Sequence, residues 1–400
     1  MALTPAAERR SFEAMAEPRS PAEVLIVGGG VAALETLMAL RDLAGDRVDI
    51  TLVAAAPDFV YRPMAVREPF AAGPPRRYPL HRIARDCDAD WTQDSLGWVD
   101  PDAQVVHTGQ GSRVEYDALL IAVGARQVDP YEHVATFNDA DADAAYHGIV
   151  QDVEGGYSRR LAFVQPVGPV WPLPLYELAL MTAERAESVD IRNLELVFVT
   201  PEARPLAIFG SAVSDVVTNR LARAGIKVYC NSLARVPAKR RLLIEPQGVE
   251  LQDQRIITMP RIAGPAVRGL PGAGAHGFLP IDKHCSVAGT GGRVFAAGDA
   301  ANYPIKHGGL GAQMADAAAA AIAVLAGSET NAPAFSPVIR GKLLTGRDPV
   351  FMSAHPVGAE SFESEVFDKP PWPSHEKVIA EELGPYLTGL DAGATSGSGR

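Results

Sequence analysis

The chain has 400 residues, of which 47% are hydrophobic, so it is long enough for two or three globular domains. Its formal net charge of −11 argues against a nucleic-acid surface, because phosphate contacts need a basic face. The three cysteines, Cys87, Cys230 and Cys285, are widely spaced and cannot form a full disulfide framework, so we expect a reducing, cytoplasmic location.

The N-terminal stretch, residues 1–22, carries charged side chains and no apolar segment, which predicts a flexible tail rather than a signal peptide. No apolar run in the sequence approaches the length of about 18 residues that a membrane-spanning helix needs. The first domain is expected to begin directly after this tail.

Residues 22–53 predict a strand, a glycine turn, a helix over about 33–43 and a second strand. In the turn, Gly28, Gly30 and Ala33 fill the three small positions of the dinucleotide-binding fingerprint. Val31 and Ala32 lie between them, at the helix N-terminus that would face the phosphates. An ordinary glycine turn of an α/β sheet remains the alternative.

The same fingerprint usually includes an acidic residue at the end of the second strand, which binds the adenosine ribose. Here that position is Ala54, and the nearest acidic residues are Asp49 and Asp58. A hydrogen bond to a charged group contributes about 1.5–3 kcal/mol, so this departure weakens nucleotide binding without abolishing it.

The next segments predict a rigid turn and a small sheet. Pro63 restricts the backbone at residues 59–63, and alternating stretches between residues 90 and 116 predict a β-meander. A buried strand then runs into a glycine turn at Ala122 and Gly124, where a backbone can approach a ligand closely.

A helix over about 139–153 precedes a second strand, turn and helix pattern, with strands at 160–165 and 194–200. The first turn of this unit, residues 166–174, is rich in proline and contains one glycine. Proline lacks the N–H donors that a pyrophosphate uses, so we expect a Rossmann-like unit that does not bind NAD(P)H tightly.

The chain then predicts a return to the first domain. Residues 293–300 indicate a buried strand that ends in Gly298 and Asp299, and a glycine-rich turn, Lys306 to Gly311, leads into an alanine-rich helix over 312–325.

The Gly28 turn, the strand and turn ending at Gly124, and residues 294–299 stand in an order that resembles the two-dinucleotide-binding-domain flavoproteins, which include the pyridine nucleotide-disulfide reductases. Residues 59–63, residues 174–177 and the Lys306 turn look most like the group of sulfide:quinone oxidoreductase, flavocytochrome c sulfide dehydrogenase and type II NADH dehydrogenase. The resemblance covers roughly residues 23–325.

The resemblance implies FAD as the cofactor, with Asp299 at the flavin ribityl chain and the helix after Lys306 pointing its N-terminus at the flavin. Lys306 would add a positive charge there and is a candidate catalytic residue, although a solvated loop lysine is the alternative. The implied cofactor-binding residues are Gly28, Gly30, Val31, Ala32, Ala33, Arg62, Pro63, Ala122, Gly124, Gly298, Asp299, Lys306, Gly309 and Leu310.

The sulfide-oxidising members of this group place a redox cysteine pair beside the flavin. At one matching position this chain has Trp171, and at the other it has Cys285. Cys285 is therefore a candidate catalytic thiol, with a buried inert cysteine as the alternative. Trp171 would either reshape the substrate pocket or pack at the domain interface. We expect no metal site.

These expectations give an α/β fold with two Rossmann-like, three-layer ββα domains. The FAD-binding domain would comprise residues 23–158 and 266–328, and the second domain, residues 159–265, would be inserted in it. Residues 329–390 would form a small C-terminal region, and residues 391–400 a disordered tail.

The resemblance implies an FAD-dependent oxidoreductase that passes electrons from an unidentified donor to a quinone or another small acceptor. The alternative is a non-catalytic or partner-dependent subunit that has lost the cysteine pair and the NAD(P)H site. Residues 375–387 carry three glutamates, Glu376, Glu381 and Glu382, and one lysine, Lys377, so we expect no membrane attachment. Membrane attachment stays open as an alternative, because quinone-reducing members of the group often bind the membrane through amphipathic C-terminal helices. A homodimer or a protein partner also stays open.

Overall fold

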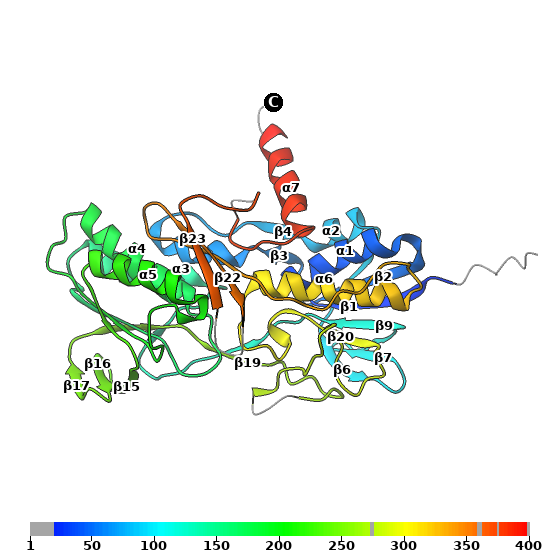
Figure 1. Ribbon diagram of the computed structural model, residues 1–400, viewed down its shortest axis with the longest axis horizontal. Helices are drawn as coiled ribbons and strands as arrows, with labels where there is room; N and C mark the ends of the chain where they lie inside the picture. Colours follow the sequence, from blue (N-terminus) through cyan, green and yellow to red (C-terminus); the bar gives the residue numbers. More distant parts are fainter. Residues whose placement is uncertain (1–19, 273–275, 358–361, 374–375, 398–400) are drawn as a thin grey trace, which may run out of the picture.

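The computed structural model describes residues 20–272, 276–357, 362–373 and 376–397 (Figure 1). Most of the predicted N-terminal tail therefore lies outside the described residues. Two parallel five-stranded sheets form the body of the molecule, which confirms the prediction of an α/β fold with two Rossmann-like units.

The first sheet has the strand order β20-β9-β1-β2-β5, and all its neighbouring strands are parallel. α1 (Val31–Ala44) and α6 (Gly308–Leu325) pack together on one face, and an antiparallel three-stranded sheet lies on the other (Figure 1). The strands of the parallel sheet are β1 (Ala22–Val27), β2 (Val48–Ala54), β5 (Asp90–Gln93), β9 (Ala118–Ile121) and β20 (Val294–Ala296). Those of the antiparallel sheet are β6 (Leu96–Asp100), β7 (Val105–Thr108) and β8 (Arg113–Glu115).

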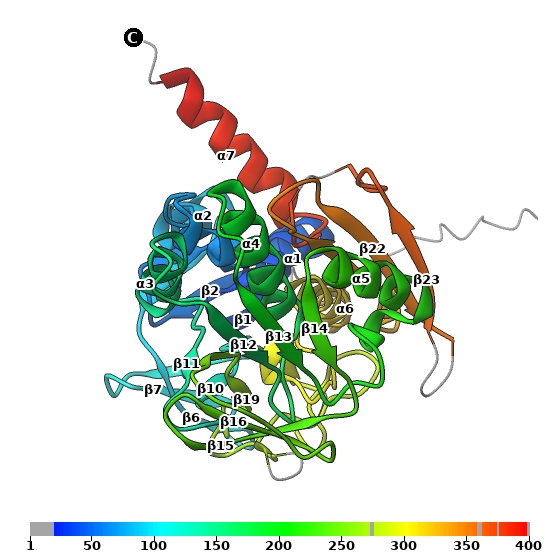
Figure 2. The ribbon, with the colours of Figure 1, turned by 90° about the vertical axis from the view of Figure 1, so that its left-hand side faces the viewer.

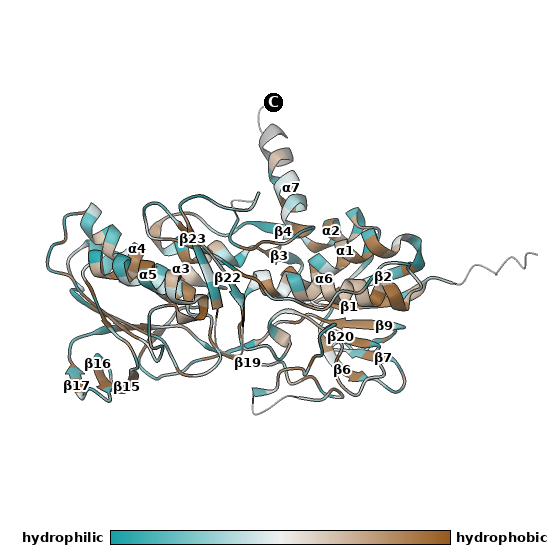
Figure 3. Cartoon of the chain, viewed as in Figure 1, coloured by the Kyte–Doolittle hydropathy of each residue, from teal (hydrophilic) through white to brown (hydrophobic). Residues whose placement is uncertain are grey.

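Burial explains why this sheet forms. β9 is buried along its whole length, and β1 is buried from Val24 to Val27, so both strands read as continuous apolar runs (Figure 3). The predicted meander differs in one respect. β5 pairs with β2 at the edge of the parallel sheet, so only β6 to β8 form the meander.

The second sheet has the strand order β11-β18-β12-β13-β14 and is also parallel. Its strands are β11 (Ala135–Thr136), β12 (Arg160–Val164), β13 (Glu195–Val199), β14 (Ile226–Tyr229) and β18 (Arg255–Thr258), and its helices are α3 (Ala142–Glu154), α4 (Leu173–Ser188) and α5 (Ser211–Arg223). β15 (Leu233–Ala238), β16 (Arg241–Glu245) and β17 (Val249–Leu251) add a small antiparallel sheet.

Two segments that we assigned to the first domain belong to the second sheet. β11 pairs with β18, and α3 packs in the same apolar core as α4, so the chain enters the second unit before residue 159. The antiparallel pair of β10 (Arg126–Val128) and β19 (Arg261–Ala263) connects the two units.

The C-terminal region consists of an antiparallel sheet and a helix. β21 (Ile339–Leu343), β22 (Val350–Pro356) and β23 (Phe362–Phe367) form the sheet, which lies beside α5 (Figure 2). α7 (Leu383–Gly397) projects from the body of the molecule. The predicted disordered tail is therefore wrong as far as Gly397, because the side chain of Asp391 pairs with Arg76. Residues 398–400 lie outside the described residues.

Short elements complete the first unit and the connections. They are η1 (Gly45–Arg47), β3 (Asp58–Val60), η2 (Arg62–Phe70), β4 (Arg77–Pro79), α2 (Leu80–Asp86), η3 (Ala207–Phe209) and η5 (Gly298–Ala300).

α6 begins earlier than expected. The sequence predicts a turn up to Gly311, but the helix starts at Gly308. A Cβ at Gly311 would lie 3.2 Å from the Cα of Gly298, so close packing on η5 offsets the low helix propensity of glycine. α6 also has the length and composition of a membrane-spanning helix, contrary to expectation, yet 67% of it is buried inside the protein, as in a soluble core helix.

Candidate functional site

A cavity of about 920 Å³ lies where the turns after β1, β9 and β20 meet the start of α6 and the second unit. Its volume is near the upper end of the range for small-molecule and cofactor sites. The carboxyl ends of parallel strands and two helix N-termini meet here, which is the usual position of a ligand in an α/β sheet. The structure brings these predicted residues together along its wall: Gly28, Gly30, Val31, Ala32, Arg62, Pro63, Ala122, Gly124, Gly298, Asp299 and Lys306.

The turn after β1 shows two different uses of glycine. A Cβ at Gly28 would lie 2.2 Å from the carbonyl oxygen of Ala122, so glycine is required for the close approach of the two turns. A Cβ at Gly30 would meet no atom within 4 Å, so the backbone of the α1 N-terminus is open to the cavity. A pyrophosphate fits such an open backbone, because the N–H groups and the helix dipole both favour an anion.

Asp299 and Lys306 lie on the side of the cavity formed by η5 and the segment before α6. The Lys306 Nζ donates hydrogen bonds to the carbonyl oxygens of Ala301 (2.5 Å) and Asp299 (3.2 Å), and lies 3.6 Å from the centre of the Phe278 ring. Burial lowers the pKa of Lys306 to about 8, opposed by the charge of Asp299. Burial raises the pKa of Asp299, while Lys306 acts in the opposite direction. Lys306 is therefore a cavity residue rather than a solvated loop lysine.

Four candidate residues do not line the cavity. Ala33 packs in the core with no exposed surface, Leu310 is buried in the core of the second unit, and a Cβ at Gly309 would lie 2.9 Å from the His307 ring. The sulfur-bearing candidate Cys285 is fully buried, and burial raises the pKa of its thiol to about 12. A thiol in this environment stays protonated at neutral pH, which matches the inert alternative.

Trp171 faces the cavity from the second unit. Its ring lies 4.7 Å from the ring of His307 and 5.9 Å from that of Phe209, measured between centroids. The imidazole therefore packs against Trp171 at the start of α6, with the two ring planes tilted by 45°. Burial, together with the charge of Lys377, lowers the pKa of His307 to about 4, so this ring is neutral at physiological pH. The Trp171 side chain thus both lines the cavity and packs between the units.

The C-terminal region supplies wall residues that the sequence did not predict. Lys377 and Val378 line the cavity, as do Gly341 and Lys342 of β21. The Lys377 Nζ lies 2.6 Å from a carboxylate oxygen of Glu177 and donates a hydrogen bond to the carbonyl oxygen of Pro63 at 3.1 Å. Two features of the sequence could have indicated this pair: Lys377 is a single lysine in an acidic segment, and Glu177 lies inside a largely apolar helix.

The position expected to bind the adenosine ribose holds no acid. Ala54 lies at the end of β2, on the cavity wall. In the second unit Glu202 follows β13, but its carboxylate accepts hydrogen bonds from the Tyr176 hydroxyl at 2.8 Å and the Thr200 hydroxyl at 3.2 Å. Both bonds end on the same oxygen of the Glu202 carboxylate, and weak NAD(P)H binding by the second unit stays a prediction.

Residues 22–155 match the family model described as pyridine nucleotide-disulphide oxidoreductase. Among curated proteins, the chain is 29% identical over 191 residues to a sulfide-quinone reductase from Aquifex aeolicus (strain VF5). That alignment covers 45% of this chain and 43% of the relative, so it spans less than half of either protein.

Two solved structures share the fold over most of the chain. The sulfide:quinone oxidoreductase of Aquifex aeolicus has a TM-score of 0.76 and 22% identity, with 87% of each chain covered. A ferredoxin reductase from Rhodopseudomonas palustris has a TM-score of 0.63 and 17% identity, with 86% of this chain and 88% of that chain covered. These findings confirm the resemblance drawn from the three glycine-bearing motifs. Residues 22–155 therefore resemble the pyridine nucleotide-disulphide oxidoreductases, and the chain has the same fold as these two solved structures.

Proposed function

We propose that the protein is an FAD-dependent oxidoreductase that passes electrons from a small donor to a quinone or another small organic acceptor. The observation that carries this proposal is the continuous cavity between the open α1 N-terminus at Gly30 and the α6 N-terminus near Lys306. FAD, when bound, would supply the transfer of hydride or electrons. The similarity to sulfide-quinone reductase supports a quinone as the acceptor.

The residues on the wall have separate tasks in this proposal. The turn from Gly28 to Ala32 would bind the pyrophosphate through backbone N–H groups. Asp299 would accept hydrogen bonds from the ribityl hydroxyls, and Lys306 would place positive charge beside the isoalloxazine. The neutral His307 and Trp171 would exclude water on the side of the second unit. No cysteine lines the cavity among the described residues, so electrons would reach the flavin without a protein disulfide.

Anaerobic titration of the flavin spectrum tests this function. Sulfide, NADH, NADPH and a reduced quinone would be added separately, and a quinone would then be offered to the reduced protein. We expect at least one donor to bleach the flavin bands fully, and we expect a quinone to restore them. A bound flavin that only dithionite reduces would contradict the oxidoreductase proposal.

The cavity also favours a second candidate, a flavoprotein-fold subunit that acts with a protein partner. Trp171 fills a position where sulfide-oxidising members of the group have a cysteine, and Cys285 is buried away from the cavity. Bound flavin that no donor reduces, together with stable co-purification of a second protein, would favour this candidate. We place either form in the cytoplasm on its cysteine usage, and co-sedimentation with liposomes tests that placement.

A further inference from the structure

The segment 376–382, called the strap here, joins the C-terminal sheet to α7 and forms part of the cavity wall through Lys377 and Val378. The Val378 N–H donates to the Tyr61 hydroxyl oxygen at 3.1 Å. A Cβ at Gly308 would lie 2.9 Å from the Val378 side chain, so the strap packs directly on the start of α6. Movement of the strap would therefore open the cavity on this side.

The end of the strap is bound by one carboxylate. Glu35 lies on α1 with no exposed surface. One of its oxygens accepts the N–H groups of Glu381 (2.5 Å) and Glu382 (3.0 Å), and the other accepts the N–H group of Leu383 (2.7 Å). Leu383 is the first residue of α7, so the charge of Glu35 also meets the positive end of the helix dipole. Charged hydrogen bonds of this kind are about twice as strong as neutral ones.

A second carboxyl group faces Glu35 from α6. The Thr36 hydroxyl of α1 donates a hydrogen bond to the carbonyl oxygen of Ala315 at 3.4 Å. The neighbouring residue on each helix, Glu35 and Asp316, therefore lies at the same α1–α6 contact. Burial, followed by the charge of Glu35, raises the pKa of Asp316 to about 8. Burial also raises the pKa of Glu35, while the three N–H donors act in the opposite direction. Among the described residues, the strap residues Glu381 and Glu382 also face this pair with negative charge. Two buried carboxylates at one helix contact cannot both ionise without strong repulsion, so one shared proton stabilises the arrangement.

We propose that Glu35 and Asp316 form a proton-dependent latch, in which one shared proton holds the strap and the start of α7 against the cavity and loss of that proton loosens them. The open strap exposes Asp316 to water, where its carboxyl group ionises at an ordinary pH. Closure therefore takes up a proton, and the closed state is favoured at low pH. Closure binds up to one proton, so the equilibrium constant for opening the strap rises by up to about tenfold per pH unit until pH reaches about 8.

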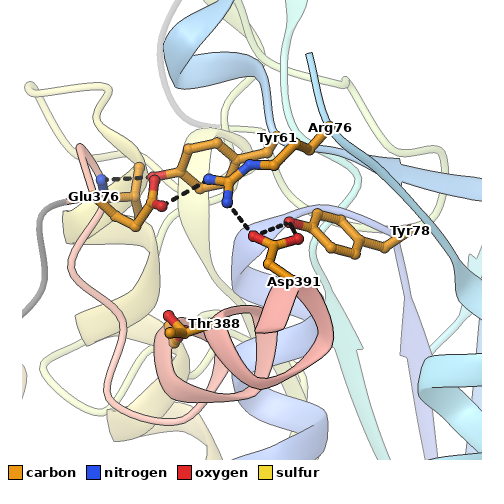
Figure 4. Close-up of polar contacts among 8 residues, drawn as sticks. Tyr61, Arg76, Tyr78, Glu376, Thr388 and Asp391 are labelled. Atoms are coloured by element: carbon orange, nitrogen blue, oxygen red, sulfur yellow. Dashed lines mark hydrogen bonds and ion pairs between the residues drawn. The ribbon is translucent and has the colours of Figure 1, made fainter. Parts of the chain in front are cut away.

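A second set of contacts holds α7 further along (Figure 4). Arg76 bridges Glu376, at 2.7 Å, and Asp391, and the Tyr78 hydroxyl donates to Asp391 at 2.9 Å. The Arg76 side chain is 41% exposed, so solvent screens these ion pairs. Salt should therefore weaken this outer anchor more than it weakens the buried latch at Glu35.

Hydrogen exchange followed by mass spectrometry tests the latch in the whole protein, and it needs no bound cofactor. Peptides that contain residues 381–383 would be followed between about pH 6 and 9, with rates corrected for the intrinsic exchange at each pH. Protection should fall as pH rises and level off above about pH 8. In Asp316→Asn, whose amide stays neutral, protection should not depend on pH. If that variant does not fold, Glu35→Gln should show a smaller pH dependence than the wild type.

Peptides from β12 and β13 serve as the internal control for global unfolding. Their protection should not change with pH over the same range. Equal protection of the strap at all pH values in the wild type would overturn the latch. An unchanged pH dependence in Asp316→Asn would also overturn it, as would a parallel loss of protection in β12 and β13.

Discussion

The buried ion pair between Glu177 and Lys377 should hold three parts of the molecule together. Glu177 lies on α4, in the second unit, and its side chain is fully buried. One carboxylate oxygen accepts from the Lys377 ammonium at 2.6 Å, and the other accepts from the backbone N–H of Leu344 at 2.9 Å. Lys377 itself donates to the carbonyl oxygen of Pro63 in the first unit. One carboxylate thus connects α4, the C-terminal sheet and the strap.

Glu177→Gln keeps the size of the side chain, but it removes the charge and replaces one of the two acceptor oxygens with an NH2 donor. It leaves the Lys377 ammonium, whose side chain is 7% exposed, without a counter-charge. Removal of one partner from a buried pair costs about 3–5 kcal/mol, because the remaining charge is poorly solvated. We therefore expect the free energy of unfolding to fall by about 3 kcal/mol.

Urea unfolding followed by circular dichroism measures this loss. Glu187→Gln is the matched control, because it makes the same chemical change on the same helix. Glu187 pairs with Arg347 at 2.8 Å, but both side chains are largely exposed. This control should change the stability little, since water screens an exposed pair. Equal losses in the two variants would show that the buried pair contributes no more than a surface pair and would refute the reasoning.

Three further predictions concern charge and the buried thiol. In Lys377→Met, Glu177 loses the ammonium that opposes the burial-driven rise of its pKa. The variant should therefore be less stable than the wild type at neutral pH and should regain stability as pH falls through that raised pKa. Urea unfolding at several pH values measures this change. Burial lowers the pKa of Lys306 to about 8, so reduction of the flavin above pH 8 should take up an additional proton at Lys306. Above pH 8 the midpoint potential of the flavin should therefore fall more steeply with pH in the wild type than in Lys306→Met. Cys285→Ala should lower the rate of flavin reduction by less than about twofold, since the thiol is protonated and lies outside the cavity. A loss of about tenfold or more in the rate measured by stopped flow would show that Cys285 takes part in the reaction.

The elements around the first glycine turn could be predicted because their signals are local. The apolar run of β1, the spacing of Gly28 and Gly30, and the largely apolar start of α1 all lie within about twenty residues of one another. The buried strand before Asp299 was found in the same way. These local patterns also placed most of the residues that meet at the cavity.

The strap and the second-unit side of the cavity could not be predicted, because they depend on contacts between distant residues. Glu35 and Leu383 are 348 positions apart, and Glu177 and Lys377 are 200 apart. Nothing in the local sequence of 376–382 indicates which face is buried. The early start of α6 was missed for a related reason, since glycine disfavours a helix until close packing on Gly298 compensates.

The central claim is that the cavity at the Gly30 turn binds a flavin dinucleotide, and the flavin content of the purified protein tests it most directly. The visible absorption spectrum would be recorded for the wild type and for Gly30→Val, after incubation with FAD and removal of the excess. A valine side chain meets no protein atom at its Cβ, so the fold should be unchanged by circular dichroism, but the side chain would occupy the space where the pyrophosphate approaches the backbone. Flavin bands near one equivalent in the wild type and a colourless, folded variant are predicted. A wild-type protein that takes up no FAD, or a variant that binds it equally well, would contradict the account.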